Sequence, residues 1–497
     1  MGDIQLTTPI PRTRDKGTAR AASGGERAHL RPAVARTLGA TGMLGVLATL
    51  FLISAGAASA PSQYVPARVG GWPGWLAGPL AGLHVGLGSS SFQVLMLIMC
   101  ASYLLVLGGA RELALAPLAG AIVLAHVILV LGPPLISQDV FGYLAFARMG
   151  ALHGLDPYTH VAAEASRDPV FAFVGWPFKH SPYGPLFTLA SYLTAPLGPA
   201  GGLWLLKILA AAASLGALAL IARAARGLGH SATTAAAFVG LNPVMLVLAV
   251  GGAHNDTLLL LSLAGALALT AVSPRPRAAS AALVAGVGVK LSAGIVLPFL
   301  VLSAPRVRER LAILAAALLS LLALALLGVL GFGVHALGFL GALGEQQQLV
   351  ATHSIPAETA RLFSLSGTPA WWRHLFAAGF LVALAATLWR TARGSDWRVC
   401  AGWATVALLA STAWLLPWYA IWLLPLAAVS GDRRLRTATL LICAYAILIH
   451  LPLADGLLSP GRQRSVTHLH LAVPGLRHRM EFASFEILHD VHVDLRW

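Results

Sequence analysis

Long apolar runs separated by short polar segments dominate the chain from residue 38 to residue 455. A helix needs about 20 apolar residues to cross a bilayer, and fewer where it crosses only part of the way. By this measure the pattern predicts an all-α polytopic membrane protein with about 13 transmembrane helices. They are expected near residues 38–58, 91–110, 113–134, 202–224, 233–251, 256–273, 278–289, 291–303, 309–332, 374–392, 397–415, 417–430 and 436–455.

Two apolar segments are predicted to depart from a simple crossing. Residues 184–198 lie between prolines and glycines, and we expect a helix that dips into the membrane from the outer side. Residues 278–303 are expected to form two short helices with Lys290 at their outer tip. Both assignments follow from the positive-inside rule, because a single full span in either place would put an arginine cluster outside.

The basic residues orient this layout with the N-terminus inside. Most of the 34 Lys and Arg residues fall in the N-terminal segment and in the loops that the layout puts in the cytoplasm. The segments then expected on the outer side are 59–90, 135–201, 333–373 and the tail from about 456. We therefore predict a multi-pass protein of the plasma membrane whose largest outer loop is residues 135–201.

Three regions differ in composition. Residues 1–37 are polar and carry seven Lys or Arg, which predicts a disordered cytoplasmic tail with no cleavable signal peptide. Residues 38–455 form the membrane domain. Residues 456–497 are polar and rich in histidine, and we expect a surface segment there rather than a metal site, because the histidines have no fixed set of partners.

Overall composition agrees with a lipid-solvated chain. Hydrophobic residues make up 57% and charged residues 11%, whereas soluble domains carry about 25% charged residues. The net charge of +15 does not indicate nucleic-acid binding, because the basic residues lie between apolar spans and not on one compact domain. The three cysteines fall inside apolar runs, so neither a disulfide framework nor a metal site is expected from them.

The stretch from Ser137 to Pro185 is a long, aromatic-rich interruption that carries charged residues. Its first carboxylate, Asp139 in S-Q-D-V-F-G-Y-L, follows the apolar run ending at Leu135 by four residues. A carboxylate at a membrane boundary is costly and is a candidate for function. Asp139 could act as a base toward an acceptor hydroxyl. The structural alternative is that it caps a helix.

A second polar motif, His254-Asn255-Asp256 in G-G-A-H-N-D, is expected on the same outer side. Three adjacent polar groups suit a ligand rich in hydroxyls, because such a ligand needs paired donors and acceptors. The alternative is that Asn255 or Asp256 caps the next helix. The three residues lack a defined metal-ligand spacing.

Cations and aromatic residues complete the set of candidates. Lys290 and Arg361 are predicted to bind a phosphate group, with Arg148 behind them, although Lys290 could instead extend to the membrane interface. His180 and Tyr183, in W-P-F-K-H-S-P-Y-G-P, are candidates for substrate binding. The aromatic residues of the outer side are expected mostly in an interface belt, or else along a lipid groove: Tyr183, Trp176, Trp414, Trp418 and Tyr419.

The order of these motifs resembles a known family. S-Q-D-V-F-G-Y-L, G-L-D-P-Y, S-P-Y-G-P, N-P-V, G-G-A-H-N-D and V-K-L-S-A-G follow one another as in the polyprenol-phosphomannose-dependent α-1,6-mannosyltransferases of actinobacterial cell envelopes. These enzymes belong to the C-type (GT-C) glycosyltransferase fold. The resemblance covers roughly residues 38–455 and leaves out the histidine-rich tail.

This resemblance implies a function. The expected donor is polyprenyl-phosphate-mannose, and the expected acceptor is a cell-envelope (lipo)mannan outside the membrane. Asp139 takes the family's role of general base, Asp256 matches the second polar motif, and Lys290 matches a lysine near the donor phosphate. Transfer is expected to invert the anomeric carbon and to form an α-1,6 linkage. No cofactor is expected, and a divalent metal is optional.

Two other functions remain open at this stage. One is a C-type glycosyltransferase for another lipid-linked sugar, such as arabinose or glucose. The other is a transporter or flippase for lipid-linked sugars, which often shows inverted repeats. We find no such repeat, and the long outer loop is unlike the short connections of a transporter.

Overall fold

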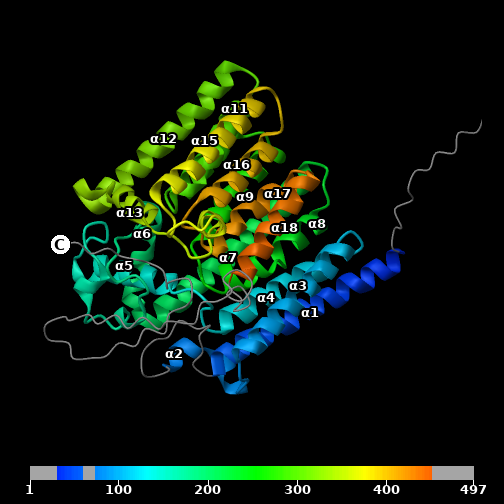
Figure 1. Ribbon diagram of the computed structural model, residues 1–497, viewed down its shortest axis with the longest axis horizontal. Coiled ribbons are helices and arrows are strands. Elements are labelled where there is room, and N and C mark those ends of the chain that lie inside the picture. The colour runs from blue at the N-terminus through cyan, green and yellow to red at the C-terminus, as the bar shows by residue number, and fades with distance from the viewer. Residues whose placement is uncertain (1–30, 60–72, 450–497) are drawn as a thin grey trace, which may run out of the picture.

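The computed structural model describes residues 31–59 and 73–449, and every regular element within these ranges is a helix (Figure 1). The predicted tail 456–497 and most of the predicted tail 1–37 lie outside the described residues. Each of the predicted membrane segments corresponds to a helix or to a pair of short helices. The all-α prediction therefore agrees with the described structure.

The first three membrane helices form a layer along one side of the molecule (Figure 1). They are α1 Pro32–Ser59, α3 Ser89–Gly109 and α4 Leu115–Leu131. A Cβ atom at Gly42 of α1 would lie 2.5 Å from the backbone oxygen of Ser102 in α3. Glycine at this position therefore allows the two helices to approach closely, as small residues do between membrane helices.

The next group leads to the second polar motif. It contains α7 Gly198–Gly227, α8 Ala232–Gly240, the π-helix η5 Val244–Val250 and α9 Asp256–Ala271. The axes of α8 and η5 differ by 50°. Pro243, at this break, has no N–H group for a helical hydrogen bond.

The predicted division at Lys290 is confirmed. α10 Pro276–Val287 ends before Lys290, and η6 Leu291–Val296 and α11 Leu297–Ser303 follow it. The next helix, α12 Val307–Phe332, runs in the same direction as α10, because Ser280 hydrogen-bonds Ile313 near their starts and Gly288 faces Leu324 near the end of α10. The segment η6–α11 therefore returns between them and leaves Lys290 at the turn.

The C-terminal helices complete the bundle (Figure 1). They are α15 Ala370–Ala392, α16 Trp397–Ser411, η8 Pro417–Leu423, α17 Leu424–Val429 and α18 Arg433–Leu448. The element η8 is buried over its whole length. It therefore brings Trp418, Tyr419 and Trp422 into the interior.

Short helices fill the segments predicted to lie outside. The first segment holds α2 Gly74–Ala77 and η1 Pro79–Leu83. The loop 135–201 holds α5 Asp139–His153, η2 Ala162–Ala165, η3 Phe171–Phe173, α6 Pro185–Ser191 and η4 Tyr192–Leu197. The third segment holds η7 Gly333–His335, α13 Gly338–Gln347 and α14 Ile355–Leu362. The predicted membrane-dipping segment 184–198 thus consists mainly of α6 and η4.

Five helices among the described residues are long and apolar enough to cross a membrane: Pro32–Ser59, Ser90–Gly109, Pro185–Gly227, Val307–His335 and Ala370–Ala392. The bent pair of α8 and η5 makes a sixth if it is counted as one span. The predicted number of about 13 is not confirmed. One reason is that α4, α9, η6–α11 and η8–α17 have only 10–17 residues each, whereas about 20 are needed for a full crossing.

The outer faces of the long helices suit a lipid environment. In α12, Leu319, Leu322 and Leu330 are 69%, 66% and 77% exposed. A continuous row of exposed leucines is unfavourable in water and favourable against lipid chains. Together with the apolar helices, it identifies a membrane protein.

Candidate active site

Asp139 is the first residue of α5, and its side chain is 13% exposed. The residue at the N-cap position is Gln138, which makes no side-chain cap hydrogen bond. The backbone N–H of Asp139 donates to Ser137 Oγ at 3.1 Å. Asp139 is therefore not the helix cap, and its carboxylate is available for another role.

His254 lies beside Asp139. The distance between His254 Nδ1 and Asp139 Oδ2 is 3.4 Å, and the His254 side chain is fully buried. The imidazole stacks on the indole of Trp418, with ring centroids 3.8 Å apart and 23° between the planes. Within the described chain, neither ring nitrogen of His254 has a hydrogen-bond partner. The ring is therefore held mainly by stacking, and the polar group it faces is the Asp139 carboxylate.

Two strained backbone positions present these residues. Ile136 has φ 66° and Ala253 has φ 54°. Non-glycine residues rarely adopt such values, and for β-branched isoleucine they are a true outlier. The N–H of Leu135 donates to the backbone oxygen of Gly251 at 2.9 Å. A backbone hydrogen bond thus joins the segment before Asp139 to the G-G-A-H-N-D motif. Backbone strain of this kind is concentrated at functional sites.

Asp256 is fully buried and is the first residue of α9. Lys290 Nζ lies 3.0 Å from each of its carboxylate oxygens. Trp422 Nε1 donates to Asp256 Oδ1 at 2.8 Å. Asn255 occupies the N-cap position of α9, as the capping alternative expects, but its side chain makes no cap hydrogen bond.

Lys290 is held inside the protein. Its side chain is 15% exposed, and Nζ lies 4.4 Å from the ring centroid of Tyr419 and 5.5 Å from that of Trp422. Rings stabilise a cation at these distances. A carboxylate and two aromatic rings therefore bind Lys290, and its place relative to the membrane interface stays a prediction.

Asn255 and Tyr183 meet through Tyr143. The hydroxyl of Tyr143 donates to Asn255 Oδ1 at 3.3 Å. The rings of Tyr143 and Tyr183 pack edge to face with centroids 5.0 Å apart. Tyr143 in α5 thereby connects the S-P-Y-G-P segment to the second polar motif.

The S-P-Y-G-P segment is also fastened beside Lys290. Gly184 N–H donates to Val289 O at 3.0 Å, and Phe187 N–H donates to Gly288 O at 3.1 Å. These bonds place the loop 135–201 against the turn that carries Lys290. The structure therefore gathers Asp139, His254, Asn255, Asp256, Tyr183 and Lys290 in one region.

His180 and Arg361 have other partners. His180 Nδ1 lies 2.8 Å from Glu345 Oε1, which links the loop 135–201 to α13. Arg361 Nη2 lies 2.5 Å from Glu358 Oε1 and also donates to Thr352 O. These contacts hold His180 and Arg361 within the segments 135–201 and 333–373.

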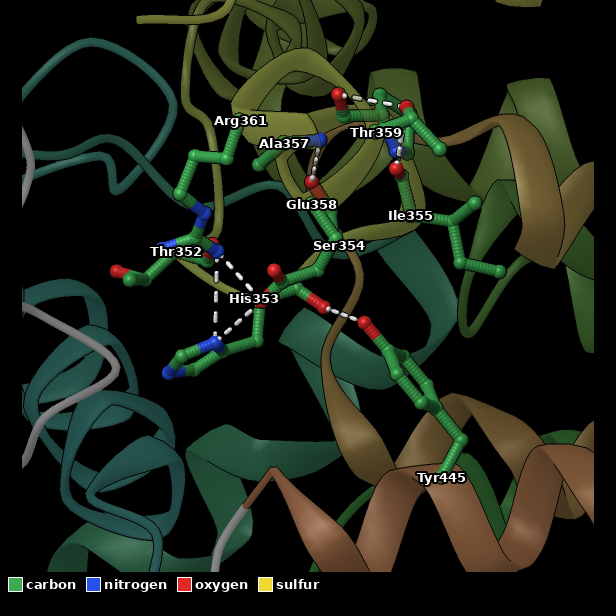
Figure 2. Close-up of polar contacts among 10 residues, drawn as sticks. Thr352, His353, Ser354, Ile355, Ala357, Glu358, Thr359, Arg361 and Tyr445 are labelled. Carbon is green, nitrogen blue, oxygen red and sulfur yellow. Dashed lines mark hydrogen bonds and ion pairs between the residues drawn. The ribbon is translucent and has the colours of Figure 1, made fainter. Parts of the chain in front are cut away.

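Figure 2 shows the cluster around Arg361. His353 Nδ1 and Glu358 Oε1 are 2.6 Å apart, and the hydroxyl of Tyr445 in α18 donates to His353 O at 2.5 Å. The backbone of Ala351 also donates to Ala413 O at 2.8 Å. This cluster fastens the segment before α14 to the loop that leads to Trp418.

Arg148, the further phosphate candidate, is paired with Asp168. Its Nε lies 2.9 Å from both oxygens of Asp168, and His153 Nε2 lies 2.8 Å from Asp168 Oδ2. Burial raises the pKa of Asp168, but hydrogen bonds from Arg148, His153 and the Val170 N–H outweigh it and lower the pKa below its ordinary value. Arg148 therefore stabilises the loop 135–201.

Several aromatic residues of the site differ from the sequence prediction. Trp414, Trp418 and Tyr419 are 8%, 4% and 8% exposed. The expectation of an interface belt is wrong for them, because they pack in the interior. Sequence reasoning missed Tyr143 and Trp422. Trp422 follows Tyr419 by three residues, a helical spacing that puts both rings on one face and offered a signal.

The first comparison with known proteins concerns families. Residues 36–306, more than half of the 497-residue chain, match the family described as "Alpha-(1->6)-mannopyranosyltransferase, N-terminal domain". The chain belongs to the alpha-(1->6)-mannopyranosyltransferase family. Residues 367–469 match the MptB C-terminal domain. This match confirms the family resemblance that the order of the sequence motifs indicates.

Two curated relatives are both named Alpha-(1->6)-mannopyranosyltransferase A. The relative from Mycobacterium tuberculosis is 32% identical over 345 residues, which cover 62% of this chain and 64% of the relative. The relative from Corynebacterium glutamicum is 33% identical over 182 residues, which cover 35% of this chain and 36% of the relative. The matched region thus spans less than two thirds of either relative. No solved structure matches.

Proposed function

We propose that this family member transfers mannose from polyprenyl-phosphate-mannose to a (lipo)mannan acceptor at the outer face of the plasma membrane. The new bond is an α-1,6 linkage, and the anomeric carbon is inverted. The observation that carries the proposal is the position of Asp139 against His254, 3.4 Å apart, next to the Asp256–Lys290 pair. The proposed base and the proposed cation thus belong to two neighbouring pairs, since His254 and Asp256 are two residues apart in the chain.

Asp139 is the proposed general base. It takes the proton of the acceptor hydroxyl while that oxygen attacks the anomeric carbon from the face opposite the phosphate. The bond from the anomeric carbon to the phosphate oxygen breaks, and polyprenyl phosphate leaves with the electron pair. His254, whose ring faces the carboxylate, holds Asp139 in place and contributes to substrate binding.

Lys290 is proposed to stabilise the departing phosphate as its charge grows. Two of the three ammonium protons are occupied by Asp256, so the third can be offered to a phosphate oxygen. Arg361 is the proposed second phosphate contact, and its side chain is 32% exposed despite the pair with Glu358. Because phosphate is a good leaving group, neither a cofactor nor a divalent metal is required.

Asn255, Tyr183 and His180 are the proposed sugar contacts. The Nδ2 atom of Asn255 is buried and without a hydrogen bond in the described structure. An unsatisfied buried amide is costly, and a substrate hydroxyl would relieve that cost.

Among the described residues, no group of three or more His, Cys, Asp or Glu side chains is arranged to hold a metal ion.

The donor's isoprenoid chain is proposed to stay in the bilayer while its sugar phosphate reaches the site. With it we propose a GT-C-like fold of about 13 membrane segments, with the N-terminus inside and the active loop 135–201 outside. Single cysteines placed at the turn of Lys290 and in the loop after Ala392 test the topology. Reaction of only the first with an impermeant thiol reagent in intact cells supports it, and the reverse pattern contradicts it.

The deciding experiment is transfer in vitro. Membranes that hold the wild-type protein or Asp139→Asn receive radiolabelled polyprenyl-phosphate-mannose and a short α-1,6-mannoside acceptor. Extension by the wild type alone supports the reaction, the donor and the base. Extension only with an arabinose or glucose donor assigns another sugar, and movement of the lipid-linked sugar across the bilayer without a new glycosidic bond assigns a transporter.

A further inference from the structure

Lys207 is a buried lysine of α7 that the proposed reaction does not use. It is 2% exposed and is among the largest fully buried side chains of the described structure. Nζ donates to Val130 O at 2.8 Å and also to Gly132 O. It lies 4.2 Å from the ring centroid of Trp204. No carboxylate pairs with it among the ion pairs of the described residues.

The end of α4 explains why an amine donor is buried there. In a continuing helix, Val130 O would accept from the N–H of residue 134, but residues 133 and 134 are prolines and have no N–H. The carbonyls at a helix C-terminus also carry partial negative charge. Lys207 therefore supplies the donor that Pro134 cannot, and the carbonyls of Val130 and Gly132 accept its hydrogen bonds.

This contact lies directly before the segment that carries Asp139. Pro133 and Pro134 stiffen the chain after Gly132. The next residue, Leu135, donates to Gly251 O at 2.9 Å, and Ile136 has φ 66°. A short, stiff and strained segment thus runs from the carbonyls bound by Lys207 to the carboxylate that faces His254.

We propose that Lys207 is a positioning residue that sets the place of Asp139 by clamping the C-terminus of α4. The inference rests on the proposed function for its effect on catalysis. Its structural part, the ordering of residues 135–139, is independent of the substrate. Without the clamp, the end of α4 frays, Leu135 loses its bond to Gly251, and Asp139 moves away from His254.

A control lies between the same two helices. His126 Nε2 in α4 lies 2.7 Å from Ser214 Oγ in α7. Ser214→Ala removes this polar contact between α4 and α7 but leaves the carbonyls of Val130 and Gly132 in place. It therefore reports what the loss of any buried polar contact between these helices does.

Hydrogen exchange of the purified full chain tests the clamp. In Lys207→Met, the amides of residues 135–139 are expected to exchange about tenfold faster or more, while Ser214→Ala exchanges as the wild type. Lys207→Arg, which keeps a cation and its donors, restores most of the protection. If Lys207→Met does not accumulate, Lys207→Gln takes its place. The proposal is overturned if the amides of residues 135–139 exchange at the wild-type rate in Lys207→Met or Lys207→Gln. It is also overturned if they exchange as fast in Ser214→Ala as in the Lys207 variant. Neither outcome depends on which reaction the protein catalyses.

Kinetics then test the link to catalysis. With the donor that the wild type uses, Lys207→Met is expected to lower kcat roughly tenfold or more, because small displacements of a reacting group cost that much. The donor KM stays within about twofold, since no contact to the substrate is removed. A changed KM with an unchanged kcat contradicts positioning. A wild type inactive with mannose donors refutes the proposed function and leaves the exchange result to decide on the clamp.

Discussion

Lys290 and Asp256 form a buried ion pair in which Nζ lies 3.0 Å from both carboxylate oxygens. Removal of one partner from such a pair leaves an uncompensated charge, which costs about 3–5 kcal/mol. We expect Asp256→Asn and Lys290→Met each to lower the free energy of unfolding by about this amount. The double variant Asp256→Asn with Lys290→Met recovers much of the stability, because no buried charge is left, but it does not recover transfer.

Thermal unfolding in detergent measures this pattern. The pair Arg306–Glu309 serves as the control, since its side chains are 82% and 41% exposed and its loss should hardly change stability. Additive losses in the double variant would show that Lys290 and Asp256 do not stabilise one another. Full activity of the double variant would remove Lys290 from the reaction.

Asp139→Asn is expected to reduce transfer by about 10²–10⁴, the usual contribution of a general base. Folding should be unaffected, because Asp139 is not the helix cap and asparagine fits the same space. The rate of transfer and the melting temperature are measured on the same preparation. Asp156→Asn is the matched control, since this outer-loop carboxylate pairs with His335 at 3.3 Å and is not assigned to the reaction. Equal losses in both variants would argue against a special role for Asp139.

His254→Phe tests the imidazole separately from its stacking. Phenylalanine keeps an aromatic ring against Trp418, whose centroid lies 3.8 Å from that of His254, but removes the nitrogen that faces Asp139. We expect kcat to fall roughly 10- to 100-fold with little change in melting temperature, because the carboxylate loses its orienting neighbour. His254→Leu, which also loses the stacking, should melt at a lower temperature. If His254→Phe keeps the kcat of the wild type, His254 contributes only to packing.

Arg361→Ala is expected to raise the donor KM about tenfold, the effect of one lost charge-assisted hydrogen bond. Tyr445→Phe removes the hydrogen bond to His353 O but keeps the charge of Arg361. It should cost about 1 kcal/mol of stability and leave the donor KM unchanged. Titration with donor at saturating acceptor separates the two effects. A lower melting temperature and an unchanged KM in Arg361→Ala would assign Arg361 to folding alone.

Asp168 makes the stability of the loop 135–201 depend on pH. Its pKa is lowered below the ordinary value of 3.8 in the folded protein, because the hydrogen bonds from Arg148, His153 and Val170 outweigh burial. The stabilisation is therefore complete above that value and is lost as the pH falls below it through the folded pKa. Melting temperatures of the wild type and Asp168→Asn should differ most at neutral pH and converge in acid. If the difference between the two melting temperatures grew in acid, the predicted direction of the pH dependence would be wrong.

The candidate site was only partly visible in the sequence. Asp139, His254, Asp256 and Lys290 stood out because charged or polar groups inside apolar runs are costly and therefore informative. Trp418 and Tyr419 were misplaced because an aromatic residue near a predicted helix end has the same pattern whether it faces lipid or the interior. Arg361 stands out by its charge, but its helical spacing from Glu358, three residues earlier, indicates a local ion pair instead.

The sequence by itself determined the apolar helices, their approximate limits and the family. Long apolar runs, prolines and glycines act locally, so the division of residues 278–303 at Lys290 followed from the chain alone. Only the tertiary structure decided which polar groups meet. Asp139 faces His254, Lys207 binds the end of α4, and Trp422 reaches Asp256. These partners are far apart in the chain, and their contacts arise from helix packing, which no local pattern of residues specifies.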